Sequence, residues 1–144
     1  MAFARINNNV HHYVSLGAKS KPALLFANSL GTDLRIWDDV TDRLNDDFRV
    51  VRYDKRGHGL SDAPPSPYSI NDLAQDVAGV LDALEIDQAV LCGVSVGGLI
   101  AQAFALNYPK RVRALLLCDT GARIGSIESW RQRIEIVRTG GLQA

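Results

Sequence analysis

Ser95 lies between two glycines at the end of an apolar run, in the sequence Gly93-Val94-Ser95-Val96-Gly97. The pattern G-x-S-x-G is typical of a serine nucleophile at a sharp turn from a strand into a helix. Such a turn favours glycines because a Cβ would keep the neighbouring backbone apart. A helix that begins directly after the serine points N–H groups toward the negative charge that develops in acyl transfer. We therefore expect Ser95 to be a nucleophile; the alternative is a glycine-rich strand end that only packs tightly.

A serine hydroxyl is a poor nucleophile until a positioned base takes its proton. The chain has three histidines, His11, His12 and His58, and all of them precede Ser95. His11 and His12 fall in an early predicted strand. His58 falls in an Arg-Gly-His-Gly turn, where we expect it to hold the loop. The sequence therefore contains a candidate nucleophile without an evident base.

Strand-like and helix-like segments alternate along the chain. A short hairpin is expected at 3–6 and 10–15, and apolar runs predict buried strands at 23–28, 48–54, 89–94 and 112–119. Helical spacing predicts helices at 34–46, 69–85 and 96–107, and the tail becomes helical again. This alternation is typical of an α/β fold, a mostly parallel sheet with helices on both faces.

Two of the predicted helices carry specific local signals. In the first, Ile36, Trp37, Val40 and Leu44 are expected to form one apolar stripe. In the second, Ser69 and Asp72 have the spacing of a capping box at the helix start.

The composition argues against several classes of function. Sixteen basic residues balance sixteen acidic ones, so nothing indicates binding to nucleic acid or to an anionic membrane surface. No apolar stretch approaches the roughly 18 residues of a membrane span, and the first residues do not read as a secretory signal. Cys92 and Cys118 fall in apolar runs without the spacing of metal ligands, which predicts two buried, reduced thiols and no metal site. We expect a soluble, cytoplasmic protein.

Three motifs in a fixed order carry a resemblance to a known family. They are NSLGTD (28–33), YDKRGHGLSD (53–62) and the G-x-S-x-G segment. Together they resemble the α/β-hydrolase fold and, more narrowly, the N-terminal portion of 3-oxoadipate enol-lactonases. The resemblance implies an oxyanion hole formed by the backbone N–H groups of Leu30 and Val96. Asn-Ser-Leu-Gly stands where many members carry His-Gly, and Val96 stands where many carry methionine, but these departures change side chains and not the N–H donors.

The resemblance also implies a reaction and a substrate. Ser95 would attack the carbonyl of an enol-lactone that carries a carboxylate, and water would then release 3-oxoadipate, a step in the bacterial catabolism of aromatic compounds. No cofactor or metal is required. The carboxylate needs a cationic partner, for which Arg133 is the first choice, with Trp130 three residues away as an apolar wall. Arg123 is the second choice. An ordinary solvated charge is the alternative for each arginine.

The resemblance places the catalytic acid and histidine beyond residue 144, because the order along this fold is serine, then acid, then histidine. Asp119, at the end of the last predicted strand, is a weaker candidate for the acid. We expect residues 1–120 to be the N-terminal part of the hydrolase core and 121–144 to begin a cap, with the fold truncated before its last strands. The strand at 112–119 would then present an open edge prone to self-association.

Without its histidine the isolated chain should be nearly inactive, since a serine protease loses roughly 10⁶ in kcat with that residue. A complementing C-terminal fragment is a possible partner. Two other functions remain open: another hydrolase of the same fold, such as a general esterase or a haloperoxidase-like enzyme, and a non-catalytic truncated scaffold that folds with a partner chain.

Overall fold

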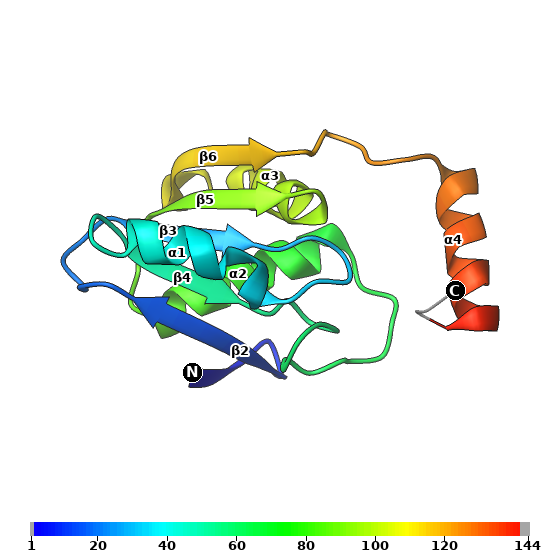
Figure 1. Ribbon diagram of the computed structural model, residues 1–144, viewed down its shortest axis with the longest axis horizontal. Helices are drawn as coiled ribbons and strands as arrows, with labels where there is room; N and C mark the ends of the chain where they lie inside the picture. The colour runs from blue at the N-terminus through cyan, green and yellow to red at the C-terminus, as the bar shows by residue number, and fades with distance from the viewer. Residues whose placement is uncertain (1, 142–144) are drawn as a thin grey trace.

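The computed structural model of the chain describes residues 2–141, and its centre is one six-stranded sheet (Figure 1). The strands are β1 (Ala2–Ile6), β2 (Asn9–Leu16), β3 (Ala23–Ala27), β4 (Arg49–Tyr53), β5 (Ala89–Val94) and β6 (Val112–Cys118). Their order in the sheet is β1-β2-β4-β3-β5-β6. β2 pairs antiparallel with β1 and β4, whereas β4, β3, β5 and β6 run parallel. The predicted mostly parallel sheet is confirmed.

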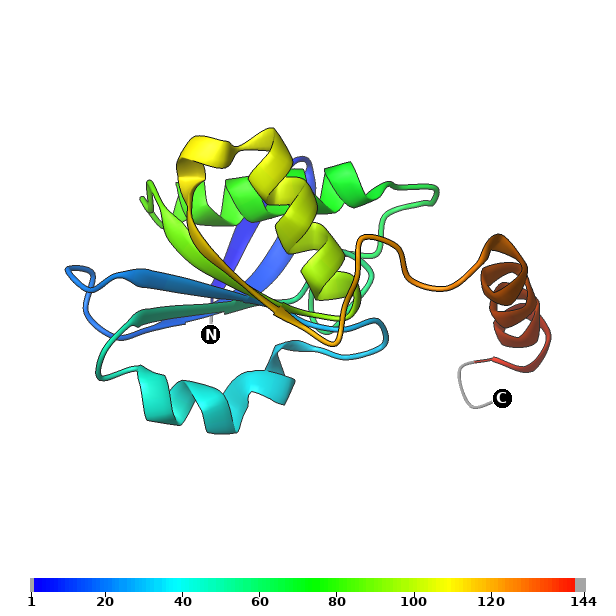
Figure 2. The same cartoon turned by 90° about the horizontal axis from the view of Figure 1, so that it is seen from above.

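Helices cover both faces of this sheet, as expected (Figure 2). The α-helix α1 (Asp38–Leu44) lies on one face, and α2 (Ile70–Ala83) and α3 (Val96–Asn107) lie on the other. Because side chains alternate along a strand, the sheet divides its apolar residues between two clusters. Leu25, Val51 and Leu91 belong to the larger cluster under α2 and α3, whereas Leu24 and Val50 belong to the smaller cluster under α1. This double burial explains the continuous apolar runs of β3, β4 and β5.

The capping box predicted for α2 is present. The hydroxyl of Ser69 accepts a hydrogen bond from the backbone N–H of Asp72 at 3.2 Å, and the Asp72 carboxylate accepts the backbone N–H of Ser69 at 2.6 Å. Two N–H groups that the helix leaves without intrahelical acceptors are thereby satisfied. The helix then buries Leu73, Val77 and Leu81 against the sheet.

The apolar stripe predicted for residues 34–46 is wrong. Leu34–Trp37 form a 3₁₀ helix, η1, and only then does α1 begin. A 3₁₀ helix has three residues per turn and an α-helix 3.6, so the buried side changes phase between them. Trp37 is buried, but Ile36 and Val40 are 44 % and 39 % exposed, and Thr41 is buried in their place.

The expectation of a buried strand at 112–119 is also wrong, although the strand forms. Within residues 2–141, β6 pairs only with β5 and is therefore an edge strand, so Leu116 and Leu117 are 49 % and 46 % exposed. The prediction of two buried thiols holds for Cys92 and fails for Cys118, which lies exposed at the end of this strand.

The chain leaves β6 through an extended segment and ends in α4 (Ile127–Gly140), which stands apart from the sheet in both views (Figures 1 and 2). The side chains of α4 are exposed apart from that of Trp130, which is half-buried. The division into a core of 1–120 and a cap that begins at 121 stays a prediction, and residues 142–144 of that segment lie outside the described residues. No helix within 2–141 has the length and apolar character needed to cross a bilayer.

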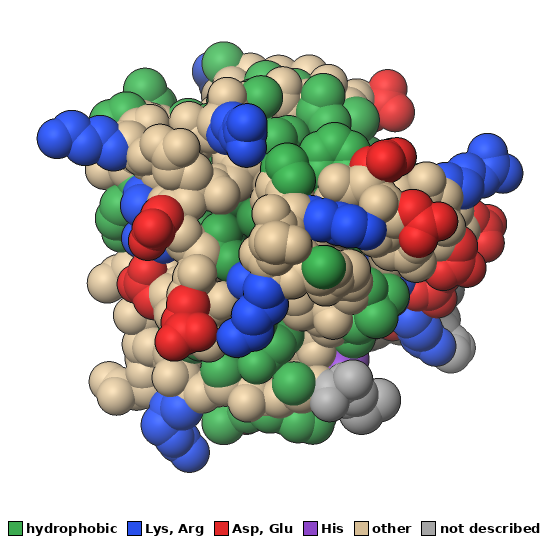
Figure 3. All heavy atoms as spheres, turned by 90° about the vertical axis from the view of Figure 1, so that its left-hand side faces the viewer, with side chains coloured by type: hydrophobic (Ala, Val, Ile, Leu, Met, Phe, Trp, Pro, Cys, Tyr) green, Lys and Arg blue, Asp and Glu red, His purple; other side chains and the backbone are tan. Residues whose placement is uncertain are grey.

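The end of the molecule away from α4, where the parallel strands begin, carries both charged and apolar side chains on its surface. Figure 3 shows acidic and basic side chains interspersed there among apolar ones. The last element before β6 is the short 3₁₀ helix η2 (Pro109–Arg111), which lies at this end.

Candidate active site

Ser95 joins β5 to α3 with a backbone conformation that few residues other than glycine adopt. Its φ is 54° and its ψ is −118°. A left-handed conformation costs a residue with a Cβ about 1–2 kcal/mol, so surrounding contacts must hold it. The N–H of Ser95 donates to the carbonyl of Cys118 at 3.0 Å, and its carbonyl accepts from Thr120 Oγ1 at 2.7 Å and from the N–H of Gly98 at 2.9 Å.

The glycines of the pattern are explained by close backbone contacts. A Cβ on Gly93 would approach the carbonyl of Gly97 to less than 3.0 Å. A Cβ on Gly97 would come equally close to the carbonyl of Ala27, at the end of the neighbouring strand β3. The turn at Ser95 therefore depends on two backbone approaches that any side chain would prevent.

The two backbone N–H groups predicted to be oxyanion donors belong to Val96 and Leu30. Val96 is the first residue of α3, so its N–H has no acceptor within the helix. Leu30 lies in the loop after β3, which starts beside the turn because Ala27 pairs with Gly93 in the sheet. Among the described residues neither N–H donates a hydrogen bond. The assignment of Leu30 and Val96 as donors stays a prediction.

The loop that carries Leu30 is held by its own polar groups and by the turn after β4. Asn28 is buried and its amide donates to Thr32. The carbonyl of Ser29 accepts from Thr32 Oγ1 at 2.9 Å and from Lys55 Nζ at 2.6 Å. The sequence did not point to Lys55, because lysines are rarely buried and its partner is 26 residues away. Burial lowers the pKa of Lys55 to about 7.

The three histidines have other partners than Ser95. His12 Nδ1 lies 2.7 Å from the Asp54 carboxylate, and His11 Nε2 lies 3.6 Å from that of Asp76. Both histidines belong to β2, which three interstrand spacings, about 14 Å, separate from β5. His58 Nε2 accepts the N–H of Gly31 at 3.1 Å, and its Nδ1 lies 3.1 Å from the carbonyl of Arg56, so it connects the loop after β3 to its own turn. The described residues thus contain no histidine hydrogen-bonded to Ser95.

Two buried carboxylates organise the turn after β4, and neither was predicted from the sequence. Asp54 accepts the backbone N–H of Leu34 at 2.8 Å and that of Leu60 at 3.0 Å, besides His12. Asp76 accepts two hydrogen bonds of 2.6 Å from Arg56. Each carboxylate ties residues that are at least six positions apart, so only the folded chain brings these groups together.

Comparison with known proteins decides the family. The model of the alpha/beta hydrolase fold family matches residues 22–139. The chain belongs to this family. It is 42 % identical over 131 residues to 3-oxoadipate enol-lactonase 2 of Acinetobacter baylyi, an alignment that covers 91 % of this chain and 49 % of that protein.

Solved structures of alpha/beta hydrolases superpose closely on this chain. The enol-lactonase from Burkholderia xenovorans LB400 matches with a TM-score of 0.95 and 43 % identity, over 99 % of this chain and 55 % of the other. A thermophilic esterase from Thermogutta terrifontis matches with a TM-score of 0.86 and 32 % identity, over 97 % and 54 %. The chain spans about half the length of the relatives it matches.

The substrate-binding candidates of this alpha/beta hydrolase lie on or before α4. The Arg133 guanidinium lies over the Trp130 ring, 5.6 Å from its centroid, and Trp130 Nε1 donates to the carbonyl of Ile124 at 2.6 Å. Arg123 is exposed in the extended segment. The structure brings Arg133 and Trp130 together but not to Ser95, since α4 stands apart (Figure 1).

Asp119, the weaker candidate for the acid, follows β6 directly. It is exposed, and its φ is 42°. The histidines of the described chain all have the other partners given above, so none lies beside Asp119 to form an acid–base pair. Its role and those of Arg133 and Trp130 stay predictions.

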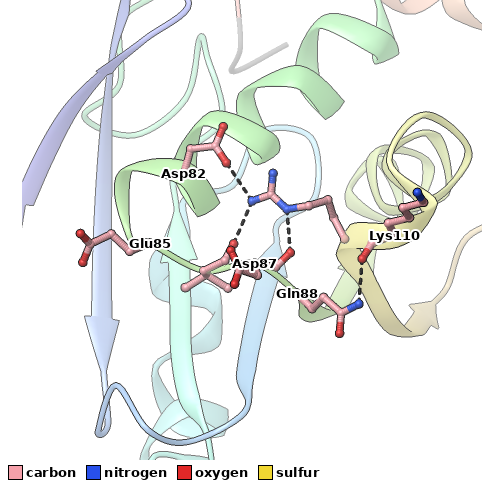
Figure 4. Close-up of a pocket in the computed structure, with 7 residues that line it drawn as sticks. Asp82, Glu85, Asp87, Gln88 and Lys110 are labelled. Atoms are coloured by element: carbon pink, nitrogen blue, oxygen red, sulfur yellow. Dashed lines mark hydrogen bonds and ion pairs between the residues drawn. The ribbon is translucent and has the colours of Figure 1, made fainter.

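A hollow of about 640 Å³ lies at the opposite end of the sheet from Ser95, between the starts of β5 and β6 (Figure 4). The Arg111 guanidinium in it donates to the Asp82 carboxylate and to the carbonyls of Ile86 and Asp87, at 2.7–2.8 Å. Gln88 donates to the carbonyl of Lys110 at 2.8 Å. These groups partner one another, so the hollow is not a competing candidate for the active site.

Proposed function

We propose that this chain carries the nucleophile and oxyanion hole of a serine hydrolase that opens the lactone ring of 3-oxoadipate enol-lactone. The observation that carries the proposal is the strained backbone of Ser95 at the start of α3, beside two N–H groups that have no acceptor among residues 2–141. The enol-lactonases among its relatives, from Acinetobacter and Burkholderia, support the substrate class.

In the proposed reaction, Ser95 Oγ attacks the lactone carbonyl and loses its proton to a base. The N–H groups of Leu30 and Val96 stabilise the oxyanion that forms, which is the main electrostatic contribution expected of this backbone. The ring C–O bond then breaks, and the departing enol oxygen takes the proton back. Water hydrolyses the ester on Ser95, and the product is 3-oxoadipate. These steps use no cofactor and no metal.

The proposed base and acid come from polypeptide outside these 144 residues. The support is that His11, His12 and His58 are each committed to partners other than Ser95. A complementing fragment or a longer gene product would supply both groups. The 144 residues alone are then expected to show negligible hydrolase activity.

The substrate carboxylate is proposed to bind Arg133, with Arg123 as the second choice. Stacking on Trp130 limits the freedom of the Arg133 side chain, which favours a defined position for its charge. Residues from 121 onward are proposed to begin the cap over the site. The proposed setting is the cytoplasm, and the free thiols of Cys92 and Cys118 are compatible with a reducing compartment.

A second candidate is a general esterase, which the structural match to the Thermogutta esterase favours. Its chemistry at Ser95 would be the same. A third is a non-catalytic scaffold, which the lack of a histidine at Ser95 favours. The substrate preference separates the first two, and reactivity of Ser95 separates both from the third.

The intact mass of the protein purified from its natural gene is the first measurement. A denatured mass near 15.7 kDa without a bound companion in the native spectrum predicts an inactive chain. A larger mass, or a companion fragment, predicts lactonase activity that Ser95→Ala abolishes. In that active form, Arg133→Ala should reduce kcat/KM for the carboxylated lactone and leave p-nitrophenyl acetate hydrolysis unchanged. Equal effects on both substrates would favour the general esterase, and a Ser95 that reacts with no phosphonate or ester would favour the scaffold.

A further inference from the structure

The backbone around Leu30 is anchored on both sides of its Cα. A peptide group is planar and trans, so its C=O and N–H point in opposite directions and turn together. The carbonyl of Ser29 and the N–H of Leu30 belong to one such group, and the carbonyl of Leu30 and the N–H of Gly31 belong to the next. A bond to the carbonyl of Ser29 therefore sets the direction of the Leu30 N–H.

Lys55 makes that bond. Its ammonium group donates to Ser29 O at 2.6 Å, and Thr32 Oγ1 donates to the same oxygen at 2.9 Å. The Lys55 side chain is enclosed, since the residue is only 2 % exposed. The Leu30 N–H consequently points away from Lys55. A hydrogen bond to the oxygen of a peptide group also polarises the group and strengthens its N–H as a donor, and the effect is greatest while Lys55 is protonated.

His58 holds the second peptide group. Its Nε2 faces the N–H of Gly31 at 3.1 Å and must accept from it, because a backbone amide can only donate. The proton of the neutral ring is then on Nδ1, which donates to the carbonyl of Arg56 at 3.1 Å. The Leu30 residue is 42 % exposed, so packing of its own side chain contributes little to the orientation of its backbone.

We propose that Lys55 and His58 are positioning residues, which together fix the orientation of the Leu30 N–H by holding the two peptide groups that flank it. The assignment of that N–H to the oxyanion hole rests on the proposed function, whereas its orientation by Lys55 and His58 does not. Both residues come from the turn after β4, so this turn, and not the loop that carries the donor, determines the donor's direction.

The turn is rigid enough for this task. The N–H of Gly57 donates to the carbonyl of Asp62 at 2.8 Å, and the Asp62 carboxylate accepts the N–H of Val10 at 2.7 Å. Burial and then the charge of Lys55 lower the pKa of His58, which keeps the ring neutral near pH 7. The charged groups that act on the ring are Lys55 and Asp54, and the loop after β3 donates the amide of Gly31 to it.

The experiment is an NMR study of the full-length gene product, with the backbone amides of Leu30 and Gly31 as probes. A matched pair of variants tests His58. Glutamine at this position carries an acceptor near the place of Nε2, whereas asparagine reaches only the place of Nδ1. We expect His58→Asn to speed exchange of the Gly31 amide at least tenfold and to shift the Leu30 signal, and His58→Gln to restore both. Lys55→Met should shift the Leu30 signal, whereas Lys110→Met, on an exposed lysine, should not.

Imidazole ¹⁵N shifts provide a second readout that does not depend on a substitution. They should report a proton on Nδ1 of His58, and the Gly31 amide signal should move when the ring is protonated at lower pH. A proton on Nε2 would overturn the proposal. Leu30 and Gly31 signals that stay unchanged in both Lys55→Met and His58→Asn would also overturn it.

Kinetics separate this inference from the proposed function. If the protein is an active hydrolase, Lys55→Met and His58→Asn should lower kcat by 10- to 100-fold with little change in KM, and His58→Gln should recover most of the loss. This is less than the roughly 10²–10³-fold cost of deleting an oxyanion donor, because the Leu30 N–H is misdirected and not removed. If the protein is longer than 144 residues, or carries a companion fragment, and is inactive but shows the expected amide shifts, the result would count against the proposed function and in favour of the positioning of Leu30 by Lys55 and His58.

Discussion

The two sides of β5 differ in how firmly they hold the strand that leads to Ser95. Toward β3 and β4, every strand residue is buried, and the charged pair of Arg56 with Asp76 is buried nearby. Toward β6, the neighbouring strand is exposed over most of its length, and the charged pair of Arg111 with Asp82 lies at the surface.

The β3 side and the β6 side of β5 contribute different contacts to the proposed site. The β3 side supplies close backbone contact, the loop that carries Leu30 and the turn that orients it. The β6 side supplies two hydrogen bonds to the Ser95 peptide groups. The orientation proposed for the Leu30 donor therefore depends on residues 27–58, whereas the backbone of Ser95 also depends on β6. Parallel substitutions on the two sides can test this division.

The largest expected contrast is between the two charged pairs. Asp76→Asn should lower the free energy of unfolding by about 3–5 kcal/mol, because it leaves the Arg56 charge buried without its counter-ion. Asp82→Asn should cost less than about 1 kcal/mol, since its pair with Arg111 is solvated. Urea unfolding of both variants measures the difference. Similar losses for the two would mean that the sides do not differ in this respect.

The next contrast concerns the glycines. Gly97→Ala forces a Cβ against the carbonyl of Ala27 and should cost about 3 kcal/mol. Gly121→Ala, beyond β6, places its Cβ 3.3 Å from the nearest atom, the carbonyl oxygen of Arg123, and should cost less than about 1 kcal/mol. Thermal or urea unfolding checks both. A Gly97→Ala protein as stable as the wild type would contradict the close approach of α3 and β3.

A smaller contrast lies in pH dependence. Folding lowers the pKa of Lys55 from 10.5 to about 7, so between these values the unfolded chain holds a proton that the folded chain has released. Raising the pH from 7 toward 8.5 should therefore increase the free energy of unfolding, by at most about 1.4 kcal/mol per pH unit. Lys55→Met should remove this slope and Lys110→Met should keep it. If the free energy of unfolding of Lys55→Met still rises with pH, another titrating group causes the slope.

The smallest effect on stability is expected at the edge strand, where the informative readout is association. Leu117→Lys should change the free energy of unfolding by less than about 0.5 kcal/mol, because the side chain is half exposed. It should nevertheless reduce self-association of the 144-residue chain in sedimentation, since charges on an edge oppose strand pairing. Leu60→Lys, on the β4 side, is the control. Equal sedimentation of wild type and Leu117→Lys would show that β6 does not mediate association.

The sequence was informative where the constraint is local. The apolar runs of β3, β4 and β5, the capping box at Ser69 and the turn at Ser95 each depend on residues close together in the chain, and the structure has all of them. The apolar stripe at 34–46 failed because a 3₁₀ turn changed the helical phase within it.

Features that depend on distant residues could not be predicted. An apolar strand reads as buried whatever covers it, so the apolar run at 112–119 by itself wrongly predicted burial of Leu116 and Leu117. Only the family resemblance, which implies further strands beyond this one, indicated an open edge. Lys55 gave no signal because its burial and its bond to Ser29 arise only when β3 and β4 lie side by side. The same applies to Asp54 and Asp76, whose partners come from several segments.

The link from Ser95 to the edge strand has a consequence for the lifetime of the reactive conformation. Its N–H is bonded to Cys118, the last residue of β6, and its carbonyl to Thr120. Edge strands open locally at a lower free energy than buried strands. Each opening of β6 is expected to release the Ser95 backbone toward an ordinary conformation, so Ser95 has the conformation proposed for a nucleophile only while β6 stays closed. Any strand that pairs with β6 would therefore lengthen the lifetime of the Ser95 conformation proposed for acyl transfer, without contacting the proposed substrate.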